Sequence, residues 1–466
     1  MGAGILELLL TAAATAVGGR EALGQSPEPG AAKPAPGWAA KAGDDEVSWA
    51  ELDGLLAERH AMSETGRAAL RHLLRARLLD ELARESSLRV TPEQVERRWR
   101  ELELEIAAAG DGSTLQDHLR QNRVPRETFR EFLRLAIVQE TLARRALGVP
   151  EGRPVPGEQQ EMWLDQIVEQ RGASYPTPPW ADGIAARCGS VVVRTPDFLE
   201  HLRGQLSEPD VREACYQILL VRRMLGRMPD LAGDALDAAV QAELARRRAE
   251  TAADPKYKGL SYEQVVAASG VRLDTLRRDP AIVSAALAHL WVERGGGEAG
   301  LKRAYREERE LYDGRFGEAV EARAIFLRAA VLTNPLNPRS FEDAERELAR
   351  VKARIEGPAD FERLAATTSE DPASREAKGL LGWVTAGDER VPEGVRAALF
   401  PRAGPAPSGL CGPLRLPAGV AILWAGERRP APGWEEMAQH VHRELRRRFV
   451  EECLPPASVV TFLEGR

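Results

Sequence analysis

The stretch from residue 369 to residue 400, SEDPASREAKGLLGWVTAGDERVPEGVRAALF, interrupts a chain that otherwise has a helical pattern. An acidic turn leads to Ser374, and Gly379 and Gly382 enclose two leucines just before Trp383. A proline, a phenylalanine and a proline- and glycine-rich loop follow. Because glycine and proline are the strongest local breaks in regular structure, this stretch excludes a purely helical fold for its surroundings.

The segment around this stretch, from about residue 318 to 430, has a mixed pattern. Residues 320–327 (VEARAIFL) have the composition of a strand, and residues 419–425 (GVAILWA) read as a buried strand. Between them, Ser340 is placed to cap one helix and Asp360 to begin a second. We therefore expect an α+β domain with two helices between its first strands.

The rest of the chain has helical periodicity. Its 466 residues are too many for one compact core, so two or three domains are expected. Leucines recur on one side of residues 66–84, residues 127–146 form a second amphipathic pattern, and Thr91-Pro92 is a helix start. We expect a mostly α multi-domain protein with one α+β domain near the C-terminus.

The helical part contains an internal repeat. Apolar positions in the first block recur 146 positions later, as in Val47 with Val193, Leu74 with Leu220, and Leu78 with Met224. Two further blocks match in order after a short deletion and a short insertion. Similar helix periodicity alone is the alternative explanation, and we favour duplication.

Breaks rich in proline and glycine set the expected domain boundaries. We expect a signal-like segment and Pro/Ala-rich linker at 1–45, a helical unit at 46–150, a Pro/Gly-rich connection at 151–188, a second helical unit at 189–300, the α+β domain at 316–430, and a C-terminal helix and strand at 431–466.

The N-terminus resembles a signal peptide. Residues 5–17 form a short apolar run followed by small residues, although Glu7 interrupts the run and no basic region precedes it. The run is too short to span a bilayer. We expect an exported protein of the periplasm or cell envelope that meets a membrane only through this signal. A cytoplasmic protein with an N-terminal tail is the alternative.

Composition argues against several classes of function. The net charge is −7 and no extended basic stripe exists, so no nucleic-acid partner is expected. The four cysteines form no C-x-x-C pair, which indicates neither zinc nor redox chemistry. Isolated buried thiols are the favoured interpretation, with one or two disulfides as the alternative. We expect no metal and no small-molecule cofactor.

The stretch at 369–400 resembles the core of the parvulin-type peptidyl-prolyl isomerases, whose usual text is S-x-D-P-x-S-x-x-x-G-G-D-L-G-W followed by V-P-x-x-x-x-A-x-F. The first helical unit resembles the N-terminal chaperone domain of the SurA family through VSWAELDGLL, TPEQVERRW and LQDHLRQNRVPRETFREFLRLAIVQETL. The resemblance implies assistance of protein folding, with unfolded or proline-containing polypeptides as clients. It also implies that the C-terminal element packs back on a helical domain.

The residues that the isomerase chemistry would use are altered. Prolyl isomerisation needs no nucleophile, because its barrier of roughly 20 kcal/mol falls when the twisted amide is bound best. By resemblance, one histidine is expected in the first strand and one in the last, where this chain has Ala324 and Ala421. No histidine occurs between His289 and His440. Asp371 matches the remaining polar position, although a turn residue that caps its own backbone is the favoured interpretation.

The expected pocket for the proline ring is also changed. By resemblance, Leu381, Val391 and Val395 stand where the family usually has Leu, Met and Phe, and Phe400 completes the apolar set. Two of these side chains are smaller than usual, so the grip should be looser. We therefore expect a chaperone with weak or absent isomerase activity. A working isomerase and a non-catalytic scaffold for one partner are the alternatives.

Overall fold

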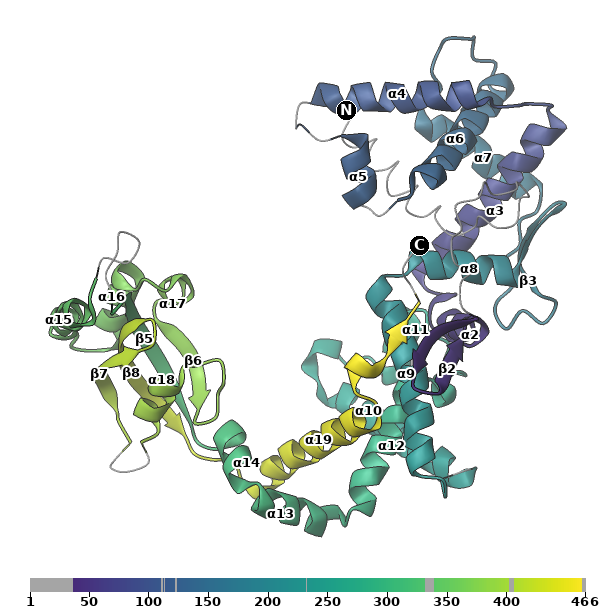
Figure 1. The fold of residues 1–466 in the computed structure, drawn as a ribbon. Coiled ribbons are helices and arrows are strands. Elements are labelled where there is room, and N and C mark those ends of the chain that lie inside the picture. Colours follow the sequence, from purple (N-terminus) through teal and green to yellow (C-terminus); the bar gives the residue numbers. More distant parts are fainter. Residues whose placement is uncertain are drawn as a thin grey trace. The chain divides into compact units, whose positions relative to one another are not determined.

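The computed structural model describes residues 37–462, apart from 110, 111, 113, 122, 123, 232, 332–338 and 402–405. Its chain divides into two compact units, the first made of residues 1–288 with 450–466 and the second of residues 289–449. The expected fold class, mostly helical with one α+β region near the C-terminus, is confirmed (Figure 1). The signal-like run at 5–17 lies outside the described residues.

The first unit repeats one order of elements: a hairpin, a short helix and a long helix. Its first half contains β1 (Trp38–Ala42), β2 (Asp45–Ser48), α2 (Trp49–His60), α3 (Glu64–Glu85), α4 (Pro92–Ala109), α5 (Leu115–Gln121), α6 (Arg126–Ala146) and α7 (Gly157–Gln170). The second half contains β3 (Ile184–Cys188), β4 (Val191–Arg194), α8 (Thr195–Gln205), α9 (Glu208–Arg227), α10 (Asp234–Ala253), η1 (Pro255–Tyr257), α11 (Tyr262–Ala268), η2 (Leu276–Arg278) and the beginning of α12 (Pro280–Arg294).

Side-chain caps explain where several of these helices begin. The hydroxyls of Ser48, Ser63 and Ser207 accept backbone N–H groups at the starts of α2, α3 and α9. At α4, Thr91 N donates to Gln94 Oε1 over 2.7 Å and Gln94 N donates to Thr91 Oγ1 over 3.4 Å, a reciprocal capping box. Donors that a helix start leaves unpaired are therefore satisfied locally.

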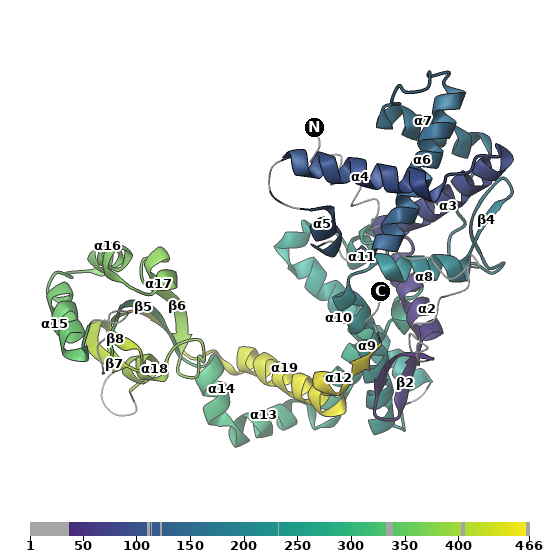
Figure 2. The ribbon, with the colours of Figure 1, turned by 45° about the horizontal axis from the view of Figure 1, so that its top comes forward.

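The two halves exchange their packing partners. Helix α3 packs on β3, β4 and α8, whereas α9 packs on β1, β2 and α2 (Figures 1 and 2). Arg77 of α3 donates to Val192 O over 2.9 Å and to the Asp197 carboxylate over 2.8 Å. Arg222 of α9 makes the same two kinds of bond, to Glu46 O and the Glu51 carboxylate.

The acceptors of these two arginines are related by the offset of 146 residues that relates the two hairpins. Each hairpin is thus held by the long helix of the other half. Between α2 and α8, Arg203 binds both oxygens of Asp53 at 2.6 and 2.8 Å and lies 4.6 Å from the Trp49 ring centre.

Two expected connections contain regular structure instead. Residues 38–45, assigned to a linker, include β1, in which Ala39, Ala40 and Ala42 are buried and Ala40 and Ala42 pair with β2. The expected connection at 151–188 contains α7 and β3. Helix α7 forms there because Trp163 and Leu164 enter the core that α3 shares with α8. Alanine content and nearby prolines hid both elements.

The second unit contains the α+β region. It comprises the end of α12, then α13 (Gly297–Glu307), α14 (Arg309–Phe316), β5 (Ala319–Arg328), α15 (Phe341–Lys352), α16 (Pro358–Thr368), α17 (Pro372–Glu376), β6 (Leu380–Thr385), α18 (Glu393–Leu399), β7 (Gly409–Leu416), β8 (Gly419–Arg429) and most of α19 (Trp434–Cys453). The second helical unit was expected to extend to residue 300, but the division falls inside α12, between Ala288 and His289.

The sheet of the second unit has four antiparallel strands in the order β6-β5-β8-β7. Helices α15 and α16 pack on one of its faces and α18 on the other (Figure 2). Successive residues of a strand point to opposite faces, so β5 and β8 supply side chains to both layers. These two central strands decide what each face contains.

The C-terminus returns to the first hairpin. After η3 (Pro456–Ser458), β9 (Val460–Thr461) pairs antiparallel with β1. Phe462 N donates to Ala39 O over 2.9 Å, and the rings of Trp38 and Phe462 meet edge to face at 6.4 Å. Both ends of the described chain therefore belong to one small sheet of the first unit.

The structure also describes the cysteines and the apolar character of the helices. Cys188, Cys215, Cys411 and Cys453 are all free thiols. Among the described residues, no helix combines the length and the apolar character that crossing a membrane requires.

We predict that replacing Arg77 with alanine weakens the first unit by about 1–3 kcal/mol, since it removes two bonds that join the two halves. Arg212→Ala is the control, because Arg212 forms an exposed ion pair with Glu208, one turn away on its own helix. That change should cost less than about 0.5 kcal/mol. Urea unfolding followed by circular dichroism measures the free energy of unfolding of both variants. Equal losses would contradict the packing of each hairpin on the long helix of the other half.

Candidate functional site

The pairing of β5 with β8 brings the two expected histidine positions together. Ala324 lies opposite Leu423, and Phe326 lies opposite Ala421, so the two alanines stand on neighbouring strands two residues apart in register. Both belong to the same hydrophobic cluster, and their exposed fractions are 7% and 1%. The first and last long strands of the domain therefore meet where the resemblance places the catalytic imidazoles.

We call this layer the candidate face. Its buried members are Val320, Ala322, Ala324, Val384, Val391, Val395, Leu399, Leu416, Ala421, Leu423 and Ala425, and its partly buried members are Phe326, Leu381, Ala398, Phe400, Cys411 and Leu414. All four expected pocket residues are included. The opposite face is a core of apolar side chains under α15 and α16.

The pocket residues fall into an inner and an outer group. Val391 and Val395 are buried, with 6% and 2% of their surfaces exposed, and they pack in the interior of the cluster. Leu381 and Phe400 are partly exposed. A polypeptide on this face would therefore touch the outer group, which also includes Phe326 and Leu414, rather than the valines.

Asp371 is engaged at a helix start. Its carboxylate accepts the backbone N–H of Ser374 over 2.8 Å and so caps α17. The neighbouring hydroxyls of Ser369 and Ser374 are buried and lie 2.9 Å apart. Phe326 N donates to Ser369 Oγ over 3.2 Å, which ties this turn to β5. The acid therefore serves the backbone of its own turn.

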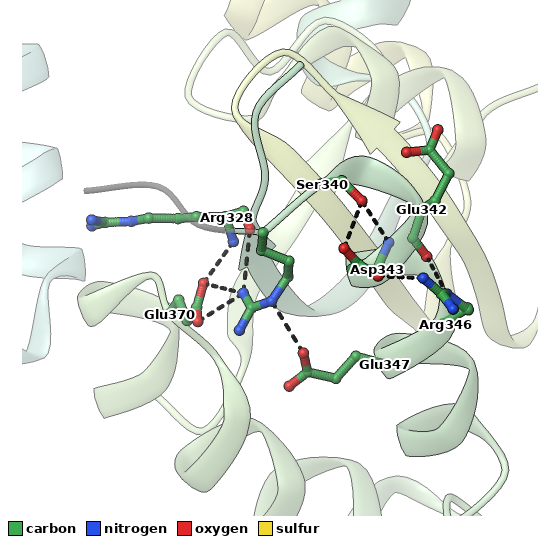
Figure 3. A network of polar contacts seen from close by, with 8 residues as sticks. Arg328, Ser340, Glu342, Asp343, Arg346, Glu347 and Glu370 are labelled. Atoms are coloured by element: carbon green, nitrogen blue, oxygen red, sulfur yellow. Dashed lines mark hydrogen bonds and ion pairs between the residues drawn. The ribbon is translucent and has the colours of Figure 1, made fainter. Parts of the chain in front are cut away.

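Glu370 fixes the same turn from its other side. Its carboxylate accepts Arg328 N over 2.7 Å and binds Arg339 through both oxygens at 2.8 Å, while Glu370 N donates to Phe326 O over 2.8 Å. Arg339 also pairs with Glu347 of α15 at 3.1 Å. Figure 3 shows Glu370 close to Arg328 at the end of β5, with Glu347 of α15 on the other side of the network. Sequence reasoning missed this cluster, for which only the acidic turn gave a signal.

The start of α15, also drawn in Figure 3, is independent of Glu370. Ser340 Oγ accepts the backbone N–H of Asp343 over 3.1 Å, as the sequence predicts, and donates to the Asp343 carboxylate over 2.8 Å. The Ser340 hydroxyl lowers the pKa of Asp343, with Arg346 adding to the effect. These polar groups fix the helix and do not reach the candidate face.

Gly379 is required where the turn joins β6. Its φ is +86°, and an added Cβ would lie 3.1 Å from Ala324 O and 3.0 Å from the Ala365 side chain. Ala324 N donates to Gly379 O over 2.8 Å. Only glycine combines this backbone conformation with so close an approach to β5.

Cys411 is the thiol of the candidate face. Burial raises the pKa of this thiol, although Lys352 and Arg428 oppose the shift. The thiol therefore stays protonated near neutral pH and is a poor nucleophile. Within the described parts of the chain, no group of three or more histidine, cysteine or acidic residues is placed to hold a metal ion.

A second concave site lies in the first unit. It has a cavity volume of about 340 Å³ and an apolar lining of Val266, Val271, Leu276, Ala281 and Ile282. Its rim carries both signs of charge, and Arg59 holds Asp279 through two bonds of 2.8 and 2.7 Å. Because this arginine is already paired, the hollow suits an apolar side chain better than an anion.

Comparisons with known proteins agree with the position of the sheet. Residues 310–400 match the family described as the PPIC-type PPIASE domain. This match ends before β7 and β8, so the position of Ala421 rests on the strand pairing. No curated protein gives a significant match to the chain.

Several solved structures are similar to this chain. The peptidylprolyl isomerase PrsA from Bacillus anthracis is 14% identical, with 52% of this chain and 91% of that chain covered and a TM-score of 0.25. A structure from work on the SurA-like chaperones PEB4 and Cj1289 of Campylobacter jejuni is 16% identical over 58% and 92%, with a TM-score of 0.23. A PpiC-type isomerase domain is 25% identical over 25% and 96%, with a TM-score of 0.20. TM-scores this low support no conclusion about this chain, which leaves the family match to residues 310–400 as the informative comparison.

We predict that Glu370→Ala loosens the turn against β5, because it leaves Arg328 N without its side-chain acceptor and removes one of the two carboxylates that bind Arg339. The cost should be about 1–3 kcal/mol, equivalent to a fall in the hydrogen-exchange protection of β5 of about 5- to 150-fold. Glu376→Ala, at an exposed position of α17, should change protection by less than about threefold. Mass spectrometry of both variants measures this, and unchanged β5 protection in the first would refute the role of Glu370.

Proposed function

We propose, on the premise that residues 310–400 belong to the PPIC-type PPIASE domain family, that this chain assists folding mainly by holding extended polypeptides. In this proposal it twists prolyl bonds weakly or not at all. The observation that carries the proposal is the pair of buried methyl groups of Ala324 and Ala421, which lie on neighbouring strands of the candidate face, two residues apart in register. Methyl groups neither donate nor accept hydrogen bonds, whereas the expected imidazoles would do both.

The nearby polar groups do not replace the imidazoles. During isomerisation the amide carbonyl swings through a twisted state, which an enzyme must bind better than either planar form. The Asp371 carboxylate caps α17, and the Cys411 thiol is protonated. Neither is arranged as an acid, a base or a hydrogen-bond partner for a moving carbonyl, which favours weak or absent catalysis.

Apolar contact with a polypeptide is retained. Phe326, Leu381, Phe400 and Leu414 give the candidate face a partly exposed edge. Fully burying one such side chain contributes about 1.5–3 kcal/mol, from which the ordering of the client must be subtracted. The face therefore suits weak, sequence-tolerant binding of proline-containing or other apolar segments. The hollow in the first unit offers a second apolar contact for the same clients.

The organisation of the chain is part of the proposal. The repeated order of hairpin and helices, which begins at β1 and again at β3, supports duplicated, SurA-like holding units, and the parvulin-like domain is proposed at 316–430. Export to the periplasm or cell envelope is proposed from the signal-like run at 5–17. A working isomerase that relies on Asp371 and a scaffold for one partner are the competing functions.

The proposal predicts that the chain does not accelerate the cis/trans relaxation of a proline tetrapeptide, yet suppresses aggregation of several unrelated denatured proteins. An intact parvulin serves as the positive control in the relaxation assay. Acceleration close to that of the control would establish a working isomerase instead. Protection of only one co-purifying protein would favour the scaffold.

A second prediction concerns the edge of the candidate face. Leu381→Ser should lower affinity for an unfolded, proline-containing peptide about 5- to 30-fold, since roughly 1–2 kcal/mol of apolar contact is lost. Leu380→Ser is the matched control, because Leu380 is the next residue of β6, is exposed, and is not in the cluster of that face. Fluorescence anisotropy of a labelled peptide measures both. Equal losses would show that binding does not use this face.

A further inference from the structure

Two histidines meet inside the first unit, between α3 and α8. The rings of His72 and His201 are stacked, with their centres 6.0 Å apart and their planes 7° from parallel. His201 is almost fully buried, with 2% of its surface exposed, and His72 is partly buried. His201 Nε2 is buried and has no hydrogen-bond partner among the described residues.

This arrangement tolerates only neutral rings. A neutral imidazole can leave one nitrogen without a hydrogen, but a protonated ring carries an N–H on both. Protonating His201 would place a new donor at a buried position that lacks an acceptor, beside a second ring that also takes up protons. Leu55 occupies the equivalent position of α2, 146 residues earlier, and is likewise buried. The first half therefore fills this position with an apolar side chain.

The surrounding charges on balance oppose a proton, although Glu161 acts in the other direction and raises the pKa of His72. Arg75 and Arg77 lie on α3, and both lower the pKa of a neighbouring histidine. The acidic groups on the adjoining elements are already bound to arginines: Glu161 and Asp165 of α7 to Arg75, Asp197 of α8 to Arg77, and Asp53 of α2 to Arg203. The buried residues of β3 and β4 that join this core are Ala185, Ala186, Cys188, Val191 and Val193.

We propose that the His72–His201 pair is an acid-sensitive latch, which holds α8 against α3 while both rings are neutral and releases α8 when they are protonated. Release would uncover the apolar residues that α8 buries in this core, Phe198 and Leu202. The bistable element is the contact between α3 and α8. The inference does not depend on the activity of the sheet domain.

The direction of the pH effect follows from the histidines. Burial first, then His72 and Arg77, lowers the pKa of His201 to about 4, and burial also lowers that of His72. A released histidine has a pKa near 6.5, so the released state binds more protons. The latch is therefore fully closed above about pH 6.5 and weakens as the pH falls towards about 4.

Hydrogen exchange of the full chain, measured by mass spectrometry at about pH 7 and about pH 5 and corrected for intrinsic rates, tests the latch. The protection of α8 should fall roughly 20-fold, the change that the two pKa values give for one histidine. Strands β5 and β8 are the internal control, because no histidine lies between His289 and His440. An equal change in the strands, or an unchanged α8, would overturn the proposal.

Two variants separate the latch from general acid effects. His201→Leu, which copies Leu55, should remove the additional loss of α8 protection at the lower pH. His118→Leu removes a histidine of α5, outside this contact, and should leave the loss in place. Persistence of the loss in His201→Leu would overturn the proposal. If that variant does not fold, the comparison of α8 with β5 and β8 in the unaltered chain decides the question.

Discussion

The helical unit depends on an exchange in which each hairpin is buried by the long helix of the other half. Arg77 and Arg222 make corresponding bonds to a backbone carbonyl and a carboxylate of the opposite half. A half alone would leave its hairpin and its long helix without their partners, so the cores of the two halves form together. The short pairing of β9 with β1 adds the C-terminus to the same assembly. Cooperation between halves, rather than the propensity of single helices, therefore stabilises this unit.

The second unit depends on a different constraint, the alternation of side chains along β5 and β8. One set of positions forms a core under α15 and α16, and the other forms the candidate face. Ala324 and Ala421 belong to the second set, so in the proposed function methyl groups there would take the place of imidazoles, which would preserve the sheet and remove polar chemistry at once. A fold can in this way keep its apolar contacts while losing its reaction. The polar residues that remain nearby support the backbone, as Glu370 and Asp371 do.

The sequence was sufficient for features that local patterns encode. It predicted the long amphipathic helices, the cap at Ser340 and the central strands, and it named six of the residues that the candidate face contains. It did not predict β1 or α7, because short alanine-rich strands and helices beside prolines have weak periodicity. It could not assign the burial that separates Leu381 from Val391, since both are aliphatic residues in similar surroundings. The Glu370 contacts were also out of reach, because Arg328 and Arg339 lie more than thirty residues away in the chain.

The two units differ in where they contain histidines. The sheet domain has none between His289 and His440, so the charge of its apolar face does not change through histidine titration. The helical unit instead buries His201 where its other half has Leu55. In our proposal, the contacts that hold α3 and α8 together are therefore sensitive to mild acid. A chain built in this way would respond to acid by exposing more apolar surface in its helical unit, while the sheet domain kept its structure. In physical terms, regulation and apolar binding would then rest on packing rather than on a catalytic group.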